Sequence, residues 1–277
     1  MPSYVQAGTY YRDFADVEAL AAYLRPDSEA GPLVSAHRGG PSPGYPENAV
    51  ATFERSMRFG PLVIECDVRM TQDSVLVLLH DDTLDRTTTG TGLLADQPFD
   101  AVRPLLLRDD TGAITPFRVP TLDEALAWAE GRTVLTLDIK RGIPPGRVVA
   151  ALERAQAADQ AMVIVYTLSD AERYAALSPD LLISASARTL DEARALVATG
   201  IAPDRLLAFT GVGTMDPALW AYLNEQGIRP IVGTFGETDE RAVRAGPEVY
   251  DRYLDAGVGM LATDAPWVAA QATAARR

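Results

Sequence analysis

Eight short apolar segments, each with an amphipathic helical segment near it, alternate along most of the chain. The apolar segments are typical of buried strands, and the helical segments repeat apolar residues every three to four positions. Eight such units in about 250 residues indicate a (β/α)8 TIM barrel, an α/β fold. A doubly wound open sheet is the alternative, but the chain has no Gly-rich turn after its first predicted strand. The predicted barrel strands are 33–37, 62–70, 133–140, 162–167, 181–187, 206–210, 230–235 and 260–263.

No linker divides the chain, so the sequence predicts a single barrel domain over residues 1–277. Residues 1–30 are predicted to form a capping region whose helix places apolar residues on one face, and Gly31-Pro32 ends it. A further strand at 75–81 opens a small insertion, 75–118, after the second barrel strand. Residues 82–118 are rich in Thr, Gly, Asp and Pro, and we expect them to be irregular and to lie beside the barrel mouth.

Two acids interrupt the apolar strand 62–70. Glu65 and Asp67 are two positions apart and therefore point to the same face of the strand, whereas Cys66 points to the other. Buried acids require partners, because an unpaired buried charge is very costly. A divalent cation such as Ca²⁺ or Mg²⁺ would reconcile the two carboxylates. Arginines from neighbouring strands would do so as well, and the segment alone does not decide between the two.

Further polar residues follow the other early strands. His37 and Arg38 end the first, His80 lies at the end of the predicted strand 75–81, and Asp138 and Lys140 end the third barrel strand. Active sites of (β/α)8 barrels are built at the carboxyl ends of the strands. Two histidines can act as general acid and base, while Arg and Lys can hold a phosphate. A cation site, a phosphate clamp and an acid–base pair together indicate cleavage of a phosphoester.

Composition excludes several other functions. The formal net charge is −13, which argues against nucleic acid as a partner and against docking on an anionic membrane. No apolar run is long enough to span a bilayer, so we expect no integral membrane segment. Met1-Pro2-Ser3-Tyr4 shows no signal peptide, which favours a cytoplasmic protein and leaves open a secreted one with a trimmed signal. The single cysteine rules out an internal disulfide, and the oligomeric state is left open.

Several motifs in order resemble the glycerophosphodiester phosphodiesterases. The resemblance runs from about residue 33 to 267, and its motifs are His37-Arg38-Gly39-Gly40, Pro46-Glu47-Asn48-Ala49, Glu65-Cys66-Asp67-Val68, His80-Asp81 through Thr88, Val119-Pro120-Thr121-Leu122-Asp123-Glu124, Asp138-Ile139-Lys140 and Gly257 through Pro266.

The resemblance implies a (β/α)8 barrel that binds one divalent cation, Ca²⁺ or Mg²⁺, and hydrolyses a small glycerophosphodiester to glycerol 3-phosphate and an alcohol. It implies that His37 and His80 are the acid–base pair and that Arg38 and Lys140 contact phosphate. Glu47 and Asn48 would line the site beside His37. The implied metal ligands are Glu65, Asp67 and Asp138.

Two departures from that family's pattern bear on the substrate. The third metal ligand is usually Glu, whereas this chain has Asp138, and an Asp at this place also occurs in the related sphingomyelinase D enzymes. Phe235 stands where a Trp is common. A lysophospholipase D or sphingomyelinase D-like activity on lysolipids is therefore an alternative, for which the apolar residues of the insertion would provide an access surface. A barrel that binds phosphate without catalysis is a further alternative.

Overall fold

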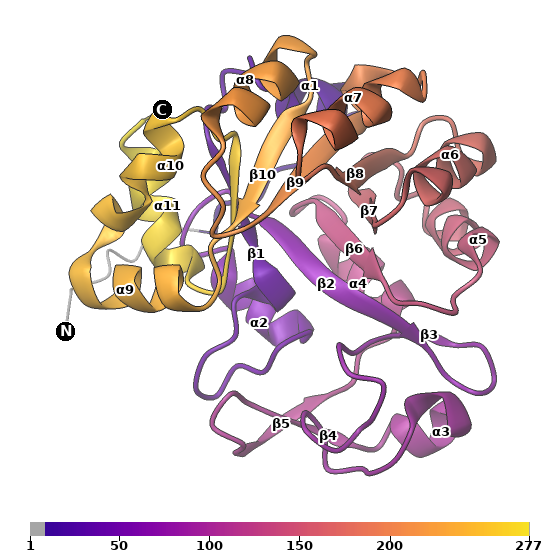
Figure 1. Ribbon diagram of the computed structural model, residues 1–277. Coiled ribbons are helices and arrows are strands. Elements are labelled where there is room, and N and C mark those ends of the chain that lie inside the picture. The colour runs from indigo at the N-terminus through magenta and orange to yellow at the C-terminus, as the bar shows by residue number, and fades with distance from the viewer. Residues whose placement is uncertain (1–8, 277) are drawn as a thin grey trace.

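Eight parallel strands form a closed ring at the centre of the computed structural model, which describes residues 9–276 (Figure 1). The ring closes because β1 pairs with both β2 and β11, with Ser35 beside Val63 and Leu33 beside Met260. This confirms the predicted (β/α)8 TIM barrel and excludes the open sheet. The barrel strands are β1 (Leu33–Ala36), β2 (Val63–Met70), β6 (Leu135–Ile139), β7 (Ala161–Val165), β8 (Leu182–Ser186), β9 (Leu206–Val212), β10 (Arg229–Gly233) and β11 (Met260–Thr263).

Helices surround this ring and cover its outer surface (Figure 1). Threonine starts three of them, since the side chains of Thr121, Thr167 and Thr189 accept hydrogen bonds from free amides of the first turn. No helix within residues 9–276 has the length and apolar character needed to cross a membrane. The helices around the ring are α2 (Val50–Ser56), α4 (Leu122–Ala129), α5 (Pro145–Ala155), α6 (Leu168–Leu177), α7 (Leu190–Ala198), α8 (Pro217–Glu225), α9 (Glu237–Ala245), α10 (Asp251–Asp255) and α11 (Pro266–Ala274), with short 3-10 turns at His37–Gly39, Pro203–Arg205 and Pro247–Tyr250.

Two apolar cores lie on the two faces of the ring. The outer core packs alternate strand residues, Cys66 among them, against the helices. The inner core fills one end of the barrel and includes Val63, Met162 and Leu182. Helix α1 (Val17–Leu24) closes that end with Leu20 and Leu24. Residues 1–8 of the predicted capping region 1–30 lie outside the described residues, and the single-domain division 1–277 stays a prediction.

The insertion after β2 is more ordered than the sequence predicts. The predicted strand 75–81 is reduced to β3 (Leu76–Leu78), which pairs antiparallel with β2, so His80 stands in the loop that follows. Residues 82–118, expected to be irregular, contain a 3-10 turn (Leu94–Asp96), α3 (Phe99–Val102) and a hairpin of β4 (Leu106–Arg108) and β5 (Ile114–Arg118). The irregular prediction is wrong here because a small apolar core, which includes Leu94, Val102 and Leu107, holds these short elements together.

Candidate active site

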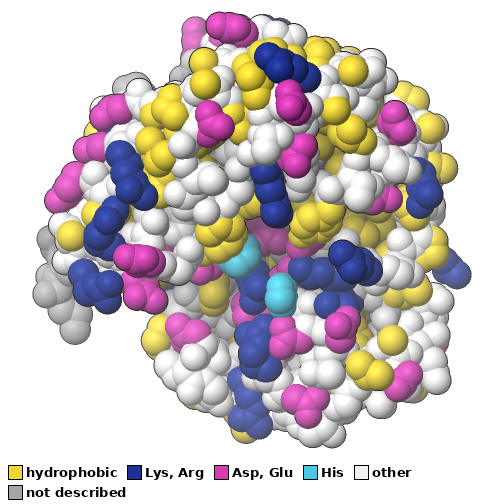
Figure 2. Space-filling view, viewed as in Figure 1, with side chains coloured by type: hydrophobic (Ala, Val, Ile, Leu, Met, Phe, Trp, Pro, Cys, Tyr) yellow, Lys and Arg dark blue, Asp and Glu magenta, His cyan; other side chains and the backbone are white. Residues whose placement is uncertain are grey.

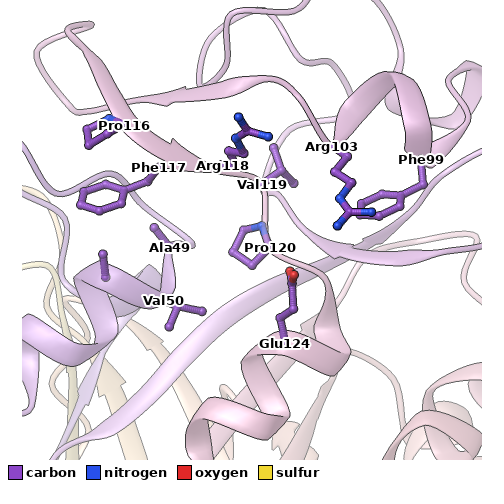
Figure 3. Close-up of a pocket in the computed structure, with 11 residues that line it drawn as sticks. Ala49, Val50, Phe99, Arg103, Pro116, Phe117, Arg118, Val119, Pro120 and Glu124 are labelled. Carbon is purple, nitrogen blue, oxygen red and sulfur yellow. The ribbon is translucent and has the colours of Figure 1, made fainter.

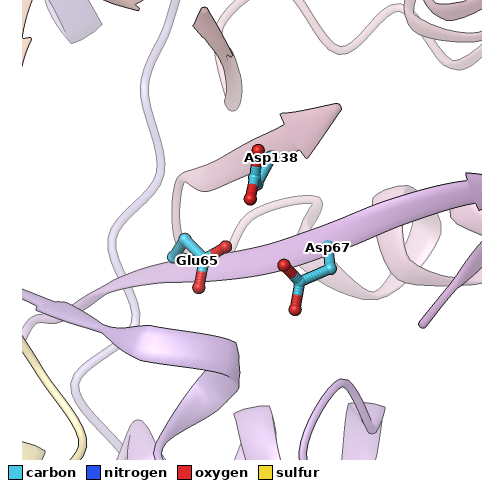
Figure 4. A group of neighbouring side chains, drawn as sticks. All are labelled: Glu65, Asp67 and Asp138. Atoms are coloured by element: carbon cyan, nitrogen blue, oxygen red, sulfur yellow. The ribbon is translucent and has the colours of Figure 1, made fainter. Parts of the chain in front are cut away.

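Three buried carboxylates meet where β2 and β6 run side by side. The register of the two strands places Asp67 directly opposite Asp138, and Glu65 lies two residues earlier on the same face of β2 (Figure 4). One oxygen from each of the three acids lies within 4.8 Å of the others. Within the described residues this is the group of acids that could hold a metal ion, and it contains the three ligands named from the sequence.

Lys140 lies between two of these acids. Its Nζ is 2.6 Å from Asp67 Oδ1 and donates a 2.5 Å hydrogen bond to Asp138 Oδ2. The other oxygen of Asp138 accepts a 2.8 Å hydrogen bond from the Tyr166 hydroxyl, at the end of β7. Both oxygens of Asp138 therefore accept hydrogen bonds, and these fix the position of its side chain, which is one methylene shorter than that of Glu.

Asn48 and Arg38 complete the surroundings of the acids. Asn48 donates to Asp67 Oδ2 at 2.7 Å and accepts from the Asp67 amide at 2.8 Å, and its positive φ of 57° is one that Asn tolerates. Arg38 donates its backbone amide to Glu65 Oε2 at 2.7 Å, and its Nε is 3.5 Å from Asp67 Oδ2. Arg38 also has a positive φ, 51°, a strained conformation that points its amide at the cluster.

The pKa values of Glu65 and Asp67 reflect how closely the acids of the cluster lie to one another and to Lys140. Burial and the neighbouring Asp67 raise the pKa of Glu65 to about 8. Burial also acts to raise the pKa of Asp67, but the charge and hydrogen bond of Lys140 outweigh it and the pKa is lowered. When ionised, the three acids carry one negative charge more than Lys140 and Arg38 together carry positive. Carboxylate oxygens with a net negative charge suit a hard divalent cation, so the donor set fits Ca²⁺ or Mg²⁺.

His37 is oriented by a residue from the other end of the chain. Its Nδ1 is 2.7 Å from Asp264 Oδ1, and its ring stacks on Phe235 with centroids 4.4 Å apart. Burial alone would lower the pKa of His37, but the hydrogen bond to Asp264 and the charge of Glu65 outweigh it and the pKa is raised. Phe235 thus serves as the platform for the ring of His37.

His80 has an equivalent partner on its own loop. Its Nδ1 is 2.7 Å from Asp81 Oδ1, and its backbone carbonyl accepts from Arg69 Nε at 2.8 Å. Arg86 joins Asp81, at 2.7 Å, to Glu47, at 2.9 Å. The Arg86 hydrogen bond holds the pKa of Asp81 well below its usual range. Glu47 also accepts from Arg38 at 3.1 Å, so a chain of ion pairs links the two histidine loops.

The site therefore gathers every residue named from the sequence, and Figure 2 shows both histidines at a hollow with cationic side chains around them. Sequence reasoning missed Asp264, Asp81, Arg86 and Tyr166 as partners of these residues. Asp81 lies within a matched motif, but as an acid in a loop it has no sequence pattern that predicts its contacts with His80 and Arg86. Asp264 is also within a matched motif, but its pairing with His37 spans 227 residues and has no local pattern.

A separate hollow lies outside the barrel mouth, between the insertion and the start of α4. It has a volume of about 550 Å³ and is lined by apolar residues such as Phe99 and Phe117 together with Arg103 and Arg118 (Figure 3). None of the predicted catalytic, phosphate or metal residues lines it. The predicted catalytic, phosphate and metal residues therefore lie apart from this hollow, at the strand ends and on the loops that follow them.

Comparisons with known proteins agree with this geometry. A solved glycerophosphoryl diester phosphodiesterase from Parabacteroides distasonis is 31% identical, with a TM-score of 0.89 over 97% of this chain and 95% of that one. A phosphodiesterase of Oleispira antarctica, solved in complex with the product sn-glycerol-3-phosphate, is 21% identical over 88% of this chain and 97% of that one and shares the fold, with a TM-score of 0.66.

A glycerophosphodiester phosphodiesterase of Caldanaerobacter subterraneus is 40% identical over 113 residues, 40% of this chain. Those residues span 46% of that relative, less than half of its length. Residues 37–207 match the glycerophosphoryl diester phosphodiesterase family, and the matched segment runs from His37 through both strands of the acidic cluster. This chain belongs to the glycerophosphoryl diester phosphodiesterase family.

Proposed function

We propose that this protein hydrolyses glycerophosphodiesters to glycerol 3-phosphate and an alcohol. The observation that carries the proposal is the meeting of His37 and His80, each with Nδ1 on a carboxylate, with the three-acid cluster at the same barrel mouth. Membership of the family and the names of its relatives support it. The glycerol 3-phosphate found with the Oleispira protein is the product expected of this reaction.

One divalent cation, Ca²⁺ or Mg²⁺, would be held by Glu65, Asp67 and Asp138. When bound, it would supply positive charge to a phosphoryl oxygen. The ammonium of Lys140 is already within 2.6 Å of Asp67, so it can place a second positive charge beside the same phosphate. Arg38 contributes through its guanidinium while its amide holds Glu65 in position.

The two histidines would move the protons of the reaction. Because each Nδ1 is engaged by a carboxylate, the free nitrogen of each ring is Nε2. A neutral ring accepts a proton at Nε2 from the nucleophile, which is water or the 2-hydroxyl of the glycerol, and a protonated ring donates from Nε2 to the leaving alcohol. With the 2-hydroxyl as nucleophile, water then opens the cyclic phosphate that forms, which gives glycerol 3-phosphate. Asp264 and Asp81 favour the Nδ1–H tautomer that leaves Nε2 free.

The structure favours small diesters over the lysolipid alternative. That alternative needs an apolar access surface, and the candidates were Leu93, Leu94, Phe99 and Leu105–Leu107. Only Leu93 is exposed, at 48%, while the others are buried or half-buried, with Leu94, Phe99, Leu105 and Leu107 packed in the core of the insertion. A lysolipid acyl chain would therefore find little apolar surface among these residues.

The test is turnover of glycerophosphocholine and of a matched lysolipid, after chelation and after addition of Ca²⁺, Mg²⁺ or Mn²⁺. We expect glycerol 3-phosphate by phosphorus NMR only with a cation present. His37→Ala and His80→Ala should each lower turnover by about 10²-fold or more while circular dichroism stays native. Turnover retained in either variant would overturn its assignment, and binding without product in the wild type would restore the non-catalytic alternative.

A further inference from the structure

Neighbouring hollows that share lining residues lie outward from Lys140 at the barrel mouth. One, of about 430 Å³, lies over the ends of β6 and β7, and another, of about 240 Å³, lies between β2 and the loop after β6. Both are lined by Lys140 and by Arg141. A third hollow, of about 440 Å³, shares Tyr166 with the first and is lined by Arg188 at the end of β8. Two arginines therefore line the hollows next to Lys140.

Arg141 and Arg188 differ from most arginines around the site because their side chains lack partners. Arg38, Arg69 and Arg86 are each ion-paired with an acid at 3.1 Å or less. The guanidinium groups of Arg141 and Arg188 are exposed and have neither an ion pair nor a hydrogen bond among residues 9–276. In a chain of net charge −13, two unpaired guanidinium groups beside the site leave local positive charge without a protein counterion.

The acids that line the same hollows already have donors. Asp82 is paired with Arg69 at 2.5 Å, and Glu192 accepts from the Arg188 amide at 2.6 Å. Asp170 accepts from Thr167 at 2.7 Å, where it starts α6. A cationic group entering these hollows would compete for occupied carboxylates, whereas an anionic group would meet free guanidinium donors.

We infer that these hollows form the subsite for the alcohol half of the substrate and select alcohols that carry their own negative charge. The inference rests on the proposed diester hydrolysis. Arg141 and Arg188 would bind a phosphate or carboxylate on the alcohol, with Lys140 holding the phosphate that is cleaved. A choline headgroup would require a cage of aromatic faces, and the exposed aromatic ring here is Tyr166, whose hydroxyl is engaged by Asp138.

The test compares two diesters that differ by one phosphate, glycerophosphoinositol 4-phosphate and glycerophosphoinositol, with glycerophosphoserine as the carboxylate arm and glycerophosphocholine as the cationic arm. We expect kcat/KM to be about tenfold or more higher for the phosphorylated diester, mainly through KM. Arg141→Gln and Arg188→Gln should each lower the phosphorylated-to-unphosphorylated ratio about threefold, and the double variant should bring it near one. Higher salt should lower the wild-type ratio.

The matched control is Arg154→Gln, an exposed arginine in the last turn of α5 that is paired with Asp123. It should leave the ratio unchanged. A wild-type ratio of one or less, or a double variant that keeps the wild-type ratio, would overturn the inference. Turnover of glycerophosphoinositol in that case would show that the proposed hydrolysis still stands, whereas turnover of no diester would contradict both.

Discussion

The contact between His37 and Asp264 joins residues far apart in the chain at one proton-transferring ring. Because the negative charge of Asp264 stabilises the protonated imidazole, its removal lowers the pKa of His37. Asp264→Asn retains a carbonyl oxygen that accepts from Nδ1–H but loses the charge. We therefore expect the limb of the pH–kcat/KM profile that reports His37 to move to lower pH.

Comparison of Asp264→Ala with Asp264→Asn separates the effect of the Asp264 charge from its effect on the orientation of the His37 ring. Asp264→Ala removes the acceptor as well, so the ring loses its fixed tautomer and kcat should fall about tenfold further than in Asp264→Asn. Asp255→Asn, which alters an exposed ion pair with Arg276, is the matched control and should leave the profile in place. An unshifted limb in Asp264→Asn would show that this carboxylate does not set the charge state of His37.

Lys140 occupies the position where it offsets the charge of two candidate metal ligands. Lys140→Met would remove the ammonium that lies 2.6 Å from Asp67 and leave the acids with a larger net negative charge. We expect the cation to bind about tenfold or more tightly, measured by calorimetry, because a unit charge at this range contributes on the order of kcal/mol even at an intermediate dielectric. Turnover should fall, since the substrate phosphate loses its contact with the ammonium group of Lys140.

Lys140→Arg keeps the positive charge and is the control for that experiment. It should bind the cation with an affinity closer to that of the wild type. Equal affinities in the wild type and Lys140→Met would mean that the lysine does not act on the metal ligands at all.

Strand alternation explains which parts of the site were predictable. Glu65 and Asp67 share a face in any strand, so their meeting follows from spacing alone. Their contact with Asp138 depends on β2 lying beside β6, which the barrel order supplied. Tyr166 and Arg86 reach the site through side-chain conformations and loop paths that have no sequence period. The hairpin of β4 and β5 was missed because three- to five-residue strands show too little alternation.

One side chain of β10 holds the segment after α1 to the end of the barrel that α1 closes. Arg229 is buried and donates to the carbonyls of Leu24, at 2.7 Å, and Gly31, at 2.9 Å, as well as to Arg25. Burial lowers the pKa of Arg229 to about 10, and no acid within residues 9–276 forms an ion pair with it. Three carbonyl groups between the end of α1 and the start of β1 thus have this guanidinium as their hydrogen-bond donor.

Arg229→Met should lower the free energy of unfolding by about 2–4 kcal/mol, since the buried carbonyl of Leu24 and the partly buried contacts to Arg25, Gly31 and Gly259 lose their donor at once. Urea denaturation measures it. Arg241→Met, at an exposed arginine of α9 with no ion pair in the described chain, is the matched control and should change stability by about 0.5 kcal/mol or less. Equal stability of the two variants would show that the segment is held mainly by the apolar contacts of α1.

Closure of the ring is what assembles the site from distant parts of the chain. His37 follows β1, the acids lie on β2 and β6, and Asp264 follows β11, which pairs with β1. The site is thus complete only when the first and last barrel strands meet. A ligand bound to the acids is accordingly bound only by the closed, folded barrel.

A cation that binds only the folded barrel stabilises it by mass action. At a concentration about 100 times Kd, the stabilisation is about 2.7 kcal/mol, which for a chain of this size raises Tm by about 5–8 °C. We expect addition of the preferred cation after chelation to give this rise, measured by calorimetry. Asp67→Asn should abolish most of the rise, whereas Asp100→Asn, an exposed acid on α3, should retain it. An equal rise in Asp67→Asn would place the cation away from β2, because Asp67 belongs to the three-acid cluster and contacts Lys140, Arg38 and Asn48.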